Sequence, residues 1–244
     1  KFWYNKGDTI YSSVLYPFSL LFRFGTKLRN VFSVEKPSEI PTICVGNIVV
    51  GGAGKTPVSM KICKMLTDAG YKPHFISKGY ASTIKESTLV ESWHSPKSVG
   101  DESLLLSKVA PTWIGTNRNE SIKLAASKGS DCIIMDDGFQ NPKIYKDFSI
   151  IVINSSQEFG NKRVMPSGPL RESIRRGFSR TNIVVVIGKI SEALKTLIPS
   201  TMPIFKARFE INKDNKIFKG KKVTAFAGIA YPNKFFKTLE TQGA

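Results

Sequence analysis

Residues 41–66 of this chain, PTICVGNIVVGGAGKTPVSMKICKML, constrain its fold more than any other stretch. They open with a short apolar run at 43–45, between a proline and a glycine, which indicates a buried strand. The glycine-rich run 51–56 follows, and it ends in a Lys-Thr pair. Apolar residues then recur at helical spacing, at Val58, Ile62, Met65 and Leu66. A strand, a glycine loop, a Lys-Thr pair and a helix in this order are typical of a phosphate-binding loop.

The chemistry of such a loop explains its residue types. Glycines let backbone N–H groups turn toward phosphate oxygens, and the helix N-terminus adds the positive end of its dipole. Lys55 can reach the β- and γ-phosphates of a nucleotide, and the Thr56 hydroxyl can ligate Mg²⁺. The strict pattern has a glycine where this chain has Val49. The alternative is a chance glycine-rich turn, but the strand and the helix stand where the motif requires them.

A candidate metal-binding carboxylate lies in residues 131–140, DCIIMDDGFQ, where an apolar run ends in two aspartates. A strand that delivers Asp136 at its C-terminal edge is the usual partner of a phosphate loop, because the carboxylate holds Mg²⁺ or its water shell. An Asp-Asp-Gly turn explains the same residues in isolation. The presence of the phosphate loop earlier in the chain favours the metal site.

Asp101 and Glu102 precede an expected helix at 103–109. Carboxylates at a helix start are favoured by capping and by the helix dipole, which is a sufficient structural explanation. The functional alternative is that Asp101 acts as a general base on a substrate hydroxyl.

Two further segments are candidates for ligand contact. Residues 77–80, SKGY, follow an expected strand at 74–77, where open α/β sheets place ligands, although a simple β-turn explains them better. The long loop 154–177 runs into a basic cluster that suits phosphate or forms a solvated helix face. The arginines of that cluster are Arg171, Arg175, Arg176 and Arg180.

Strands alternate with helices along most of the chain. Further apolar runs stand at 112–114, 148–153 and 182–188, and a helix is expected to run through 124–126. This alternation predicts an α/β fold with a mostly parallel sheet and helices on both faces. Two alternating runs, 204–211 and 216–223, then predict a hairpin. Residues 223–239 resemble the start of a new strand–helix unit, with a strand at 223–229 and a helix at 235–239. Because one such unit cannot build a core, we expect an incomplete second α/β domain there.

The formal net charge of +17 implies an anionic partner such as a nucleotide, a nucleic acid or an acidic membrane. No nucleic-acid-binding signature is present, so we expect no nucleic-acid partner. Residues 10–24 are apolar and aromatic, are broken by Pro17, and are too short and too polar to span a bilayer. Positive charges follow them, so they suit an interfacial anchor or, alternatively, a helix packed on the domain's core. The three dispersed cysteines favour a reducing, cytoplasmic compartment.

Taken together, these motifs resemble the tetraacyldisaccharide 4′-kinase family of lipid A biosynthesis. The resemblance covers nearly the whole chain. Its segments are the N-terminal FWY, VGNIVVGGAGKTP, SKGY, VGDE, MDDGFQ, FGNKRVMPSGPLRE and FAGIAYPNKFF. Because the family also lacks the first glycine of the phosphate-loop pattern, Val49 fits it.

The resemblance implies ATP- and Mg²⁺-dependent phosphorylation of the 4′-hydroxyl of a membrane-embedded tetraacyldisaccharide 1-phosphate. It implies Asp101 as the general base, Lys55 as a catalytic residue and Thr56, Asp136 and Asp137 on the metal side. Arg171 and Tyr80 are the substrate-binding candidates. The ATP-binding residues would be Val49, Val50, Gly51, Gly52, Ala53, Gly54, Lys55 and Thr56.

The family also implies a domain layout and a location. We expect a membrane-associated segment at 1–36, a P-loop kinase domain at 37–203, a two-stranded linker at 204–223 and the beginning of a smaller domain at 224–244. The enzyme would work at the cytoplasmic face of the inner membrane of a Gram-negative bacterium, against anionic lipid.

This sequence departs from the family pattern at two places. Asn141 stands where family members usually carry histidine, and the Asp-His-Tyr motif whose histidine partners the base is absent. The chain is therefore expected to bind ATP better than it turns it over. Two other classes are a GTPase or metallochaperone NTPase, whose Asn-Lys-x-Asp motif is absent after residue 153, and a membrane-surface ATPase switch without lipid kinase activity.

Overall fold

The computed structural model describes residues 2–4, 9–79, 82–210, 219–228, 232–241 and 243, with the side chains of 232–234 left out. The chain divides into two compact units, residues 1–206 and 207–244, which are described separately. The first unit contains the sheet, except for the last residue of its edge strand, Ala207, and every site residue that the structure describes.

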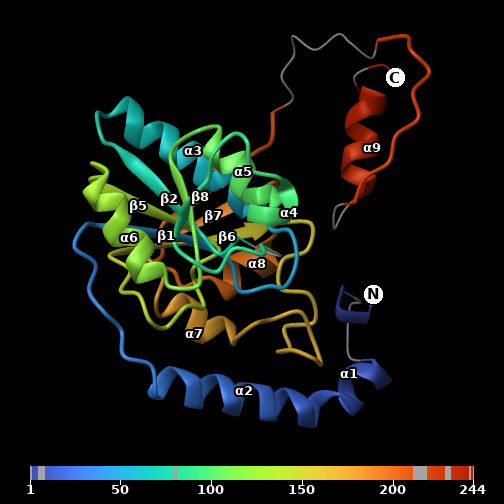
Figure 1. Ribbon diagram of the computed structural model, residues 1–244. Coiled ribbons are helices and arrows are strands. Elements are labelled where there is room, and N and C mark those ends of the chain that lie inside the picture. Colours follow the sequence, from blue (N-terminus) through green and yellow to red (C-terminus); the bar gives the residue numbers. More distant parts are fainter. Residues whose placement is uncertain are drawn as a thin grey trace. The chain divides into compact units, whose positions relative to one another are not determined.

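An eight-stranded sheet forms the centre of the first unit, in the order β3-β4-β2-β5-β1-β6-β7-β8 (Figure 1). The pairs from β4 through β2, β5, β1 and β6 to β7 are parallel, and β3 is antiparallel to its neighbour β4. The strands are β1 Thr42–Gly46, β2 Pro73–Ser77, β3 Thr88–Leu89, β4 Thr112–Ile114, β5 Cys132–Asp136, β6 Phe148–Asn154, β7 Ile183–Ile187 and β8 Ile204–Ala207. The predicted, mostly parallel α/β sheet is therefore confirmed.

Helices cover both faces of the sheet, as the alternation of strands and helices predicts. Figure 1 shows α3 and α5 on one face and α6 and α7 on the other. Right-handed crossovers require this, because the connections through α3 and α5 move along the sheet toward β3, whereas those through α6 and α7 move toward β8. The helices are α1 Ile10–Val14, α2 Tyr16–Val31, α3 Lys55–Asp68, α4 Pro96–Val99, α5 Asp101–Ser107, α6 Arg118–Ser127, α7 Ile174–Phe178, α8 Glu192–Leu197 and α9 Pro232–Thr241, after a 3₁₀ turn at Phe2–Tyr4.

The core lies on the central strands. All five residues of β5 are buried, and so are six of the seven residues of β6. Near-continuous apolar runs are what a parallel sheet covered on both faces requires. Phe75, Phe139 and Phe159 are the largest fully buried side chains. The sheet is thus a rigid base from which the loops at its carboxyl edge project.

The N-terminal helices contact the loop after β6, within the same unit, through polar groups. The Ser19 hydroxyl donates to the Val164 carbonyl at 2.8 Å, and the Ser167 hydroxyl donates to the Ser12 carbonyl. Ser12 and Ser19 are the buried residues of α1 and α2, whereas the large apolar side chains of these helices are exposed. The break expected at Pro17 falls at Leu15, between α1 and α2, and Pro17 lies in the first turn of α2, where a proline is tolerated.

The second unit contains α9, which confirms the helix expected at 235–239. The strand expected at 223–229 is wrong for 223–228, which form no strand. An extended segment is a strand only where a neighbour pairs with its backbone, and 223–228 have none among the described residues. In the hairpin expected at 204–223, the first run forms β8, and 219–223 of the second run form no strand. Residues 211–218 of the hairpin and residue 229 of the expected strand lie outside the described residues.

Candidate active site

The phosphate loop connects β1 to α3 as predicted. Gly54 is the N-cap residue of α3 and has a φ of 86°, in the left-handed region that a residue with a Cβ rarely adopts. The amides of Gly52 and Gly54 make no hydrogen bond with the described part of the chain, whereas the Val50 amide donates to the Pro169 carbonyl at 2.8 Å. The glycine amides and the helix N-terminus are therefore the groups available to a phosphate.

Asp136 lies at the end of β5 and faces the start of α3. Its carboxylate accepts hydrogen bonds from the Thr56 hydroxyl at 2.9 Å and from the Ser59 hydroxyl at 2.8 Å. Burial raises the pKa of Asp136, while these two hydrogen bonds and the charge of Lys55 oppose that rise. The phosphate loop and the predicted carboxylate thus meet at one edge of the sheet.

Asp137 lies between two cations. Its carboxylate is 3.7 Å from Lys55 Nζ and accepts hydrogen bonds from both terminal nitrogens of Arg171, at 3.0 and 3.3 Å. The φ of Asp137 is 53°, which is uncommon for a residue other than glycine. This backbone conformation turns the second aspartate of the pair toward Lys55 and Arg171.

Arg171 is positioned by the long loop after β6. Its backbone amide donates to the Ile48 carbonyl at 2.7 Å, which attaches this loop to the segment before the glycines. Its guanidinium also donates to the Gln140 side chain at 3.1 Å. Gln140 in turn donates to the Asn47 carbonyl and to the Glu172 carboxylate, at 2.8 and 3.1 Å. The loop and Gln140 therefore hold the Arg171 guanidinium in its orientation toward Asp137.

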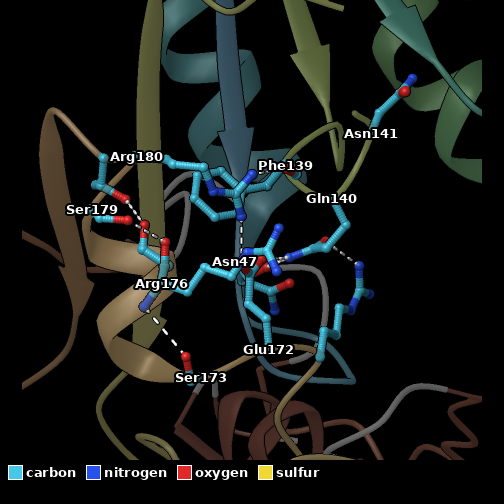
Figure 2. Close-up of polar contacts among 12 residues, drawn as sticks. Asn47, Phe139, Gln140, Asn141, Glu172, Ser173, Arg176, Ser179 and Arg180 are labelled. Carbon is cyan, nitrogen blue, oxygen red and sulfur yellow. Dashed lines mark hydrogen bonds and ion pairs between the residues drawn. The ribbon is translucent and has the colours of Figure 1, made fainter. Parts of the chain in front are cut away.

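Glu172 continues this network away from Asp137. It is 6% exposed and forms ion pairs with Arg176 and Arg180 at 3.7 and 2.5 Å. The Arg180 guanidinium also stacks 4.7 Å above the Phe139 ring. Figure 2 shows these side chains grouped around Gln140. Two arginines of the predicted basic cluster are thus bound to a buried carboxylate, and Arg171 is the one that faces the phosphate loop.

Asp101 and Glu102 begin α5 after Gly100, as expected. Burial raises the pKa of Glu102, and the charges of Asp136, Asp137 and Asp101 raise it further, while Lys55 lowers it. Glu102 therefore lies within electrostatic reach of the phosphate-loop site. Tyr80, the other substrate-binding candidate, lies outside the described residues.

Several residues around the site were not anticipated from the sequence. Ser59 is one turn into α3, and a serine four residues after the loop lysine has no recognised pattern. Gln140 and Glu172 lie next to predicted motifs, but their contacts depend on loops that are far apart in the chain. Of the residues near the site that no motif identified, only Glu102 could have been singled out from the sequence, because it adjoins Asp101 in an acidic pair at a helix start.

The donor set fits Mg²⁺. This ion usually keeps several waters and binds through one or two carboxylates together with substrate phosphates. A buried carboxylate with a raised pKa, beside a hydroxyl and the phosphate-loop amides, gains most from a nearby divalent charge. Within the described ranges no group of three or more His, Cys, Asp or Glu is placed to hold a metal by itself. Thr56 and Asp136 are the residues that would hold the ion when ATP is present.

The sequence of this chain matches a family of known proteins. A family profile described as "Tetraacyldisaccharide-1-P 4'-kinase" matches residues 11–244. The chain belongs to this family. The tetraacyldisaccharide 4'-kinases of Paramagnetospirillum magneticum and Rhodospirillum rubrum are 42% and 40% identical to it over the whole chain, which spans 75% of each relative.

A solved structure of the tetraacyldisaccharide-1-P 4'-kinase family agrees with the fold. LpxK from Aquifex aeolicus, whose crystal structure was determined in complex with ATP, is 28% identical to this chain. The two superimpose with a TM-score of 0.78, over 94% of this chain and 78% of that chain. Sequence and architecture therefore agree on the family that the motifs predicted.

Proposed function

We propose that this protein transfers the γ-phosphoryl group of ATP to the 4′-hydroxyl of a tetraacyldisaccharide 1-phosphate, a step of lipid A biosynthesis. One observation carries the proposal. Lys55 and Thr56 of the phosphate loop face Asp137 and Asp136 at 3.7 and 2.9 Å, in a chain of the tetraacyldisaccharide-1-P 4'-kinase family. Phosphoryl transfer depends mainly on positioning and on neutralising phosphate charge, and this arrangement can provide both.

Each side chain has a separate task in the proposed reaction. The loop amides and Lys55 hold the β- and γ-phosphates, and Lys55 neutralises charge that develops during transfer. Thr56 and Asp136 would hold Mg²⁺, which would supply further neutralisation of the phosphate charge. Asp101 accepts the proton of the 4′-hydroxyl. Arg171, which binds Asp137 at 3.0 and 3.3 Å, orients that carboxylate and is proposed to contact the acceptor.

We further propose that α1 and α2 dock the enzyme onto the cytoplasmic face of the inner membrane. These helices expose large apolar side chains, while Arg23, Lys27 and Arg29 add positive charge along α2. The apolar residues are Ile10, Tyr11, Val14, Phe18, Leu20, Leu21, Phe22, Phe24, Leu28 and Val31. An exposed apolar face with adjacent basic residues is what an interfacial helix requires. Within the described ranges, no helix is both long and apolar enough to cross a membrane.

The domain layout of the proposal follows the family. Residues 37–203 would form the kinase domain, 1–36 the membrane-associated segment, 204–223 the linker and 224–244 the beginning of a smaller domain. A membrane-surface ATPase switch would share the phosphate loop but would leave the lipid unmodified. Family membership favours the kinase, and formation of a phosphorylated lipid separates the two.

Lys55→Ala tests the kinase directly. We expect loss of ³²P transfer from labelled ATP to tetraacyldisaccharide 1-phosphate in detergent micelles, because the γ-phosphate loses its cation. Thin-layer chromatography of the lipid product is the measurement. Lys61→Ala, which removes an exposed lysine from the same helix, is the matched control and should keep wild-type activity. Near-normal turnover by Lys55→Ala would refute the phosphate-loop assignment.

A further inference from the structure

Part of the long loop after β6, residues 159–171, contacts the N-terminal helices at one end and the phosphate loop at the other. We call it the connecting loop. Its backbone is bonded to itself: the Met165 amide donates to the Leu170 carbonyl at 2.8 Å, and the Asn161 side chain donates to the Ser167 carbonyl at 2.9 Å. Ser167 and Leu170 are also buried. A loop held together in this way can carry a change at one end to the other.

Toward α1 and α2, the connecting loop binds the two buried serines of these helices. The Ser19 hydroxyl donates to the Val164 carbonyl at 2.8 Å and accepts a hydrogen bond from the Ser167 amide at 3.1 Å. The Ser12 carbonyl accepts hydrogen bonds from the Ser167 hydroxyl and, at 3.2 Å, from the Arg163 guanidinium. The large apolar side chains of both helices stay exposed. The loop and a lipid surface would therefore contact different side chains of the same two helices.

The 3₁₀ turn at Phe2–Tyr4 makes a second attachment to the connecting loop. The Trp3 indole donates to the Pro166 carbonyl at 2.9 Å, and the Trp3 carbonyl accepts a hydrogen bond from the Asn161 amide at 2.8 Å. Gly160 lies directly against this turn, because a Cβ at that position would lie 2.5 Å from the Trp3 carbonyl oxygen. The N-terminal turn is thus fitted closely to the connecting loop.

Toward the phosphate loop, the connecting loop pairs with residues 48–50, which lead into the glycines. Leu170 and Val49 form an antiparallel bridge, with one backbone hydrogen bond on either side of it. The Tyr4 hydroxyl donates to the Val50 carbonyl at 3.4 Å, so the N-terminal turn also contacts this segment directly. The backbone that leads into the phosphate-binding amides is therefore supported by a loop whose other end rests on α1 and α2.

The attachment of α1 and α2 to the connecting loop can open at low cost. Ser12 and Ser19 are the buried residues of these helices, so the attachment rests on hydrogen bonds and little buried apolar area. Such bonds replace bonds to water and add little net stability, and segments with few buried apolar contacts open locally. A helix as short as α2 is also marginal in water by itself. A lipid surface that takes up the apolar side chains orders both helices and so favours the attached state.

We propose that binding of α1 and α2 to an anionic lipid surface orders the connecting loop and, through it, the phosphate loop, so that the membrane-bound protein binds ATP more tightly than the free protein. This inference rests on the proposed membrane contact and adds regulation of the nucleotide site to it. ATP is then held preferentially where the lipid acceptor is present. Linkage requires the converse, so ATP must tighten membrane binding by the same factor.

The test measures the affinity of the intact chain for nucleotide with and without vesicles. The vesicles contain phosphatidylglycerol and no acceptor lipid, and the nucleotide is a labelled, non-hydrolysable ATP analogue with Mg²⁺. Equilibrium dialysis gives its Kd, with vesicles alone as the blank. For the wild type we expect saturating vesicles to lower this Kd about 5-fold or more. Vesicle flotation with and without the nucleotide should give the same factor.

Ser19→Ala separates the loop contact from the lipid contact. It removes the hydroxyl that binds Val164 and Ser167 but leaves the apolar side chains, so vesicle binding should persist while the gain in nucleotide affinity is lost. Ser13→Ala, at an exposed position of α1, is the matched control and should keep the full gain. If Ser19→Ala fails to fold, Trp3→Phe makes the same comparison, because it keeps an aromatic ring and loses the indole donor.

The possible outcomes separate the coupling from the proposals on which it rests. Wild-type protein that binds vesicles without a change in nucleotide affinity would overturn the coupling and leave the membrane contact in place. A full gain in both Ser19→Ala and Trp3→Phe would show that the connecting loop is not the route. Loss of vesicle binding in Ser19→Ala would contradict the division between loop contact and lipid contact. If the wild type binds no vesicles, the membrane contact itself fails and the coupling fails with it, whereas phosphoryl transfer to micellar acceptor still tests the kinase.

Discussion

Asp101 and Glu102 are adjacent carboxylates with different surroundings, and only one of them can be the general base. The pKa of Glu102 is raised by burial and by the charges of Asp136 and Asp137. A raised pKa suits a proton acceptor near neutral pH, but it also arises wherever carboxylates crowd around a phosphate site. The roles of the two residues are therefore separated by comparison of isosteric variants.

We expect Asp101→Asn to lower kcat about 10²- to 10⁴-fold with little change in ATP affinity, because the hydroxyl proton loses its acceptor. Glu102→Gln should retain most of kcat. Steady-state kinetics with both substrates, combined with ATP binding by calorimetry, is the measurement. The reverse order of the two variants would transfer the base to Glu102. A loss of ATP binding in Asp101→Asn would assign that residue to the nucleotide.

The residues of the site were predictable to the extent that they belong to local motifs. Lys55, Thr56 and Asp136 stand at spacings that the chemistry of a phosphate loop requires, and the structure brings them together. The contact between Gln140 and Glu172 follows no such rule, because it joins two loops that are far apart in the sequence.

Among the elements, α1 and α2 carry the clearest prediction, because they bury serines and expose aromatic and aliphatic side chains. Substituting Phe18 and Leu21 by aspartate removes two apolar groups that would enter the lipid interface. Burial of each group there contributes about 1.5–3 kcal/mol to the free energy of membrane binding. We expect binding to vesicles that contain phosphatidylglycerol to fall at least about 100-fold. Vesicle flotation measures it.

Met65 provides the matched control for that experiment. It is 59% exposed on α3, on the sheet face opposite α6 and α7, so Met65→Asp should leave vesicle binding unchanged. Kinase activity on short-chain, micellar acceptor should survive in the double variant, since the active site is untouched. Unaltered vesicle binding by the double variant would show that α1 and α2 do not contact the membrane.

Long apolar strands were predictable as elements, whereas short and unpaired segments were not. The runs that became β1, β5, β6 and β7 are buried on both faces, so their composition alone identifies them. Two-residue β3 is too short to show alternation, and four-residue α4 is too short to show helical periodicity. The run at 223–228 has strand composition, but a strand also needs a pairing partner, which composition does not reveal.

At the scale of the whole molecule, the net charge of +17 should add to the membrane affinity that α1 and α2 provide. Positive charge near an anionic leaflet is worth about 1 kcal/mol per residue close to the surface and decays within a Debye length. That length shrinks from about 10 Å at 0.1 M salt to about 3 Å at 1 M. Membrane attachment should therefore have an electrostatic part that salt removes and an apolar part that salt leaves in place.

Vesicle flotation over a salt series separates these two parts. On vesicles with phosphatidylglycerol we expect the bound fraction of wild-type protein to fall steeply between 0.1 and about 1 M NaCl. On purely zwitterionic vesicles, binding should be weak and almost independent of salt, because only the apolar side chains of α1 and α2 contribute to the binding free energy on such a surface. The variant with Phe18 and Leu21 substituted should keep the salt-dependent part and lose the other. Salt-independent binding of the wild type to anionic vesicles would contradict this division and would leave the basic surface without a part in membrane attachment.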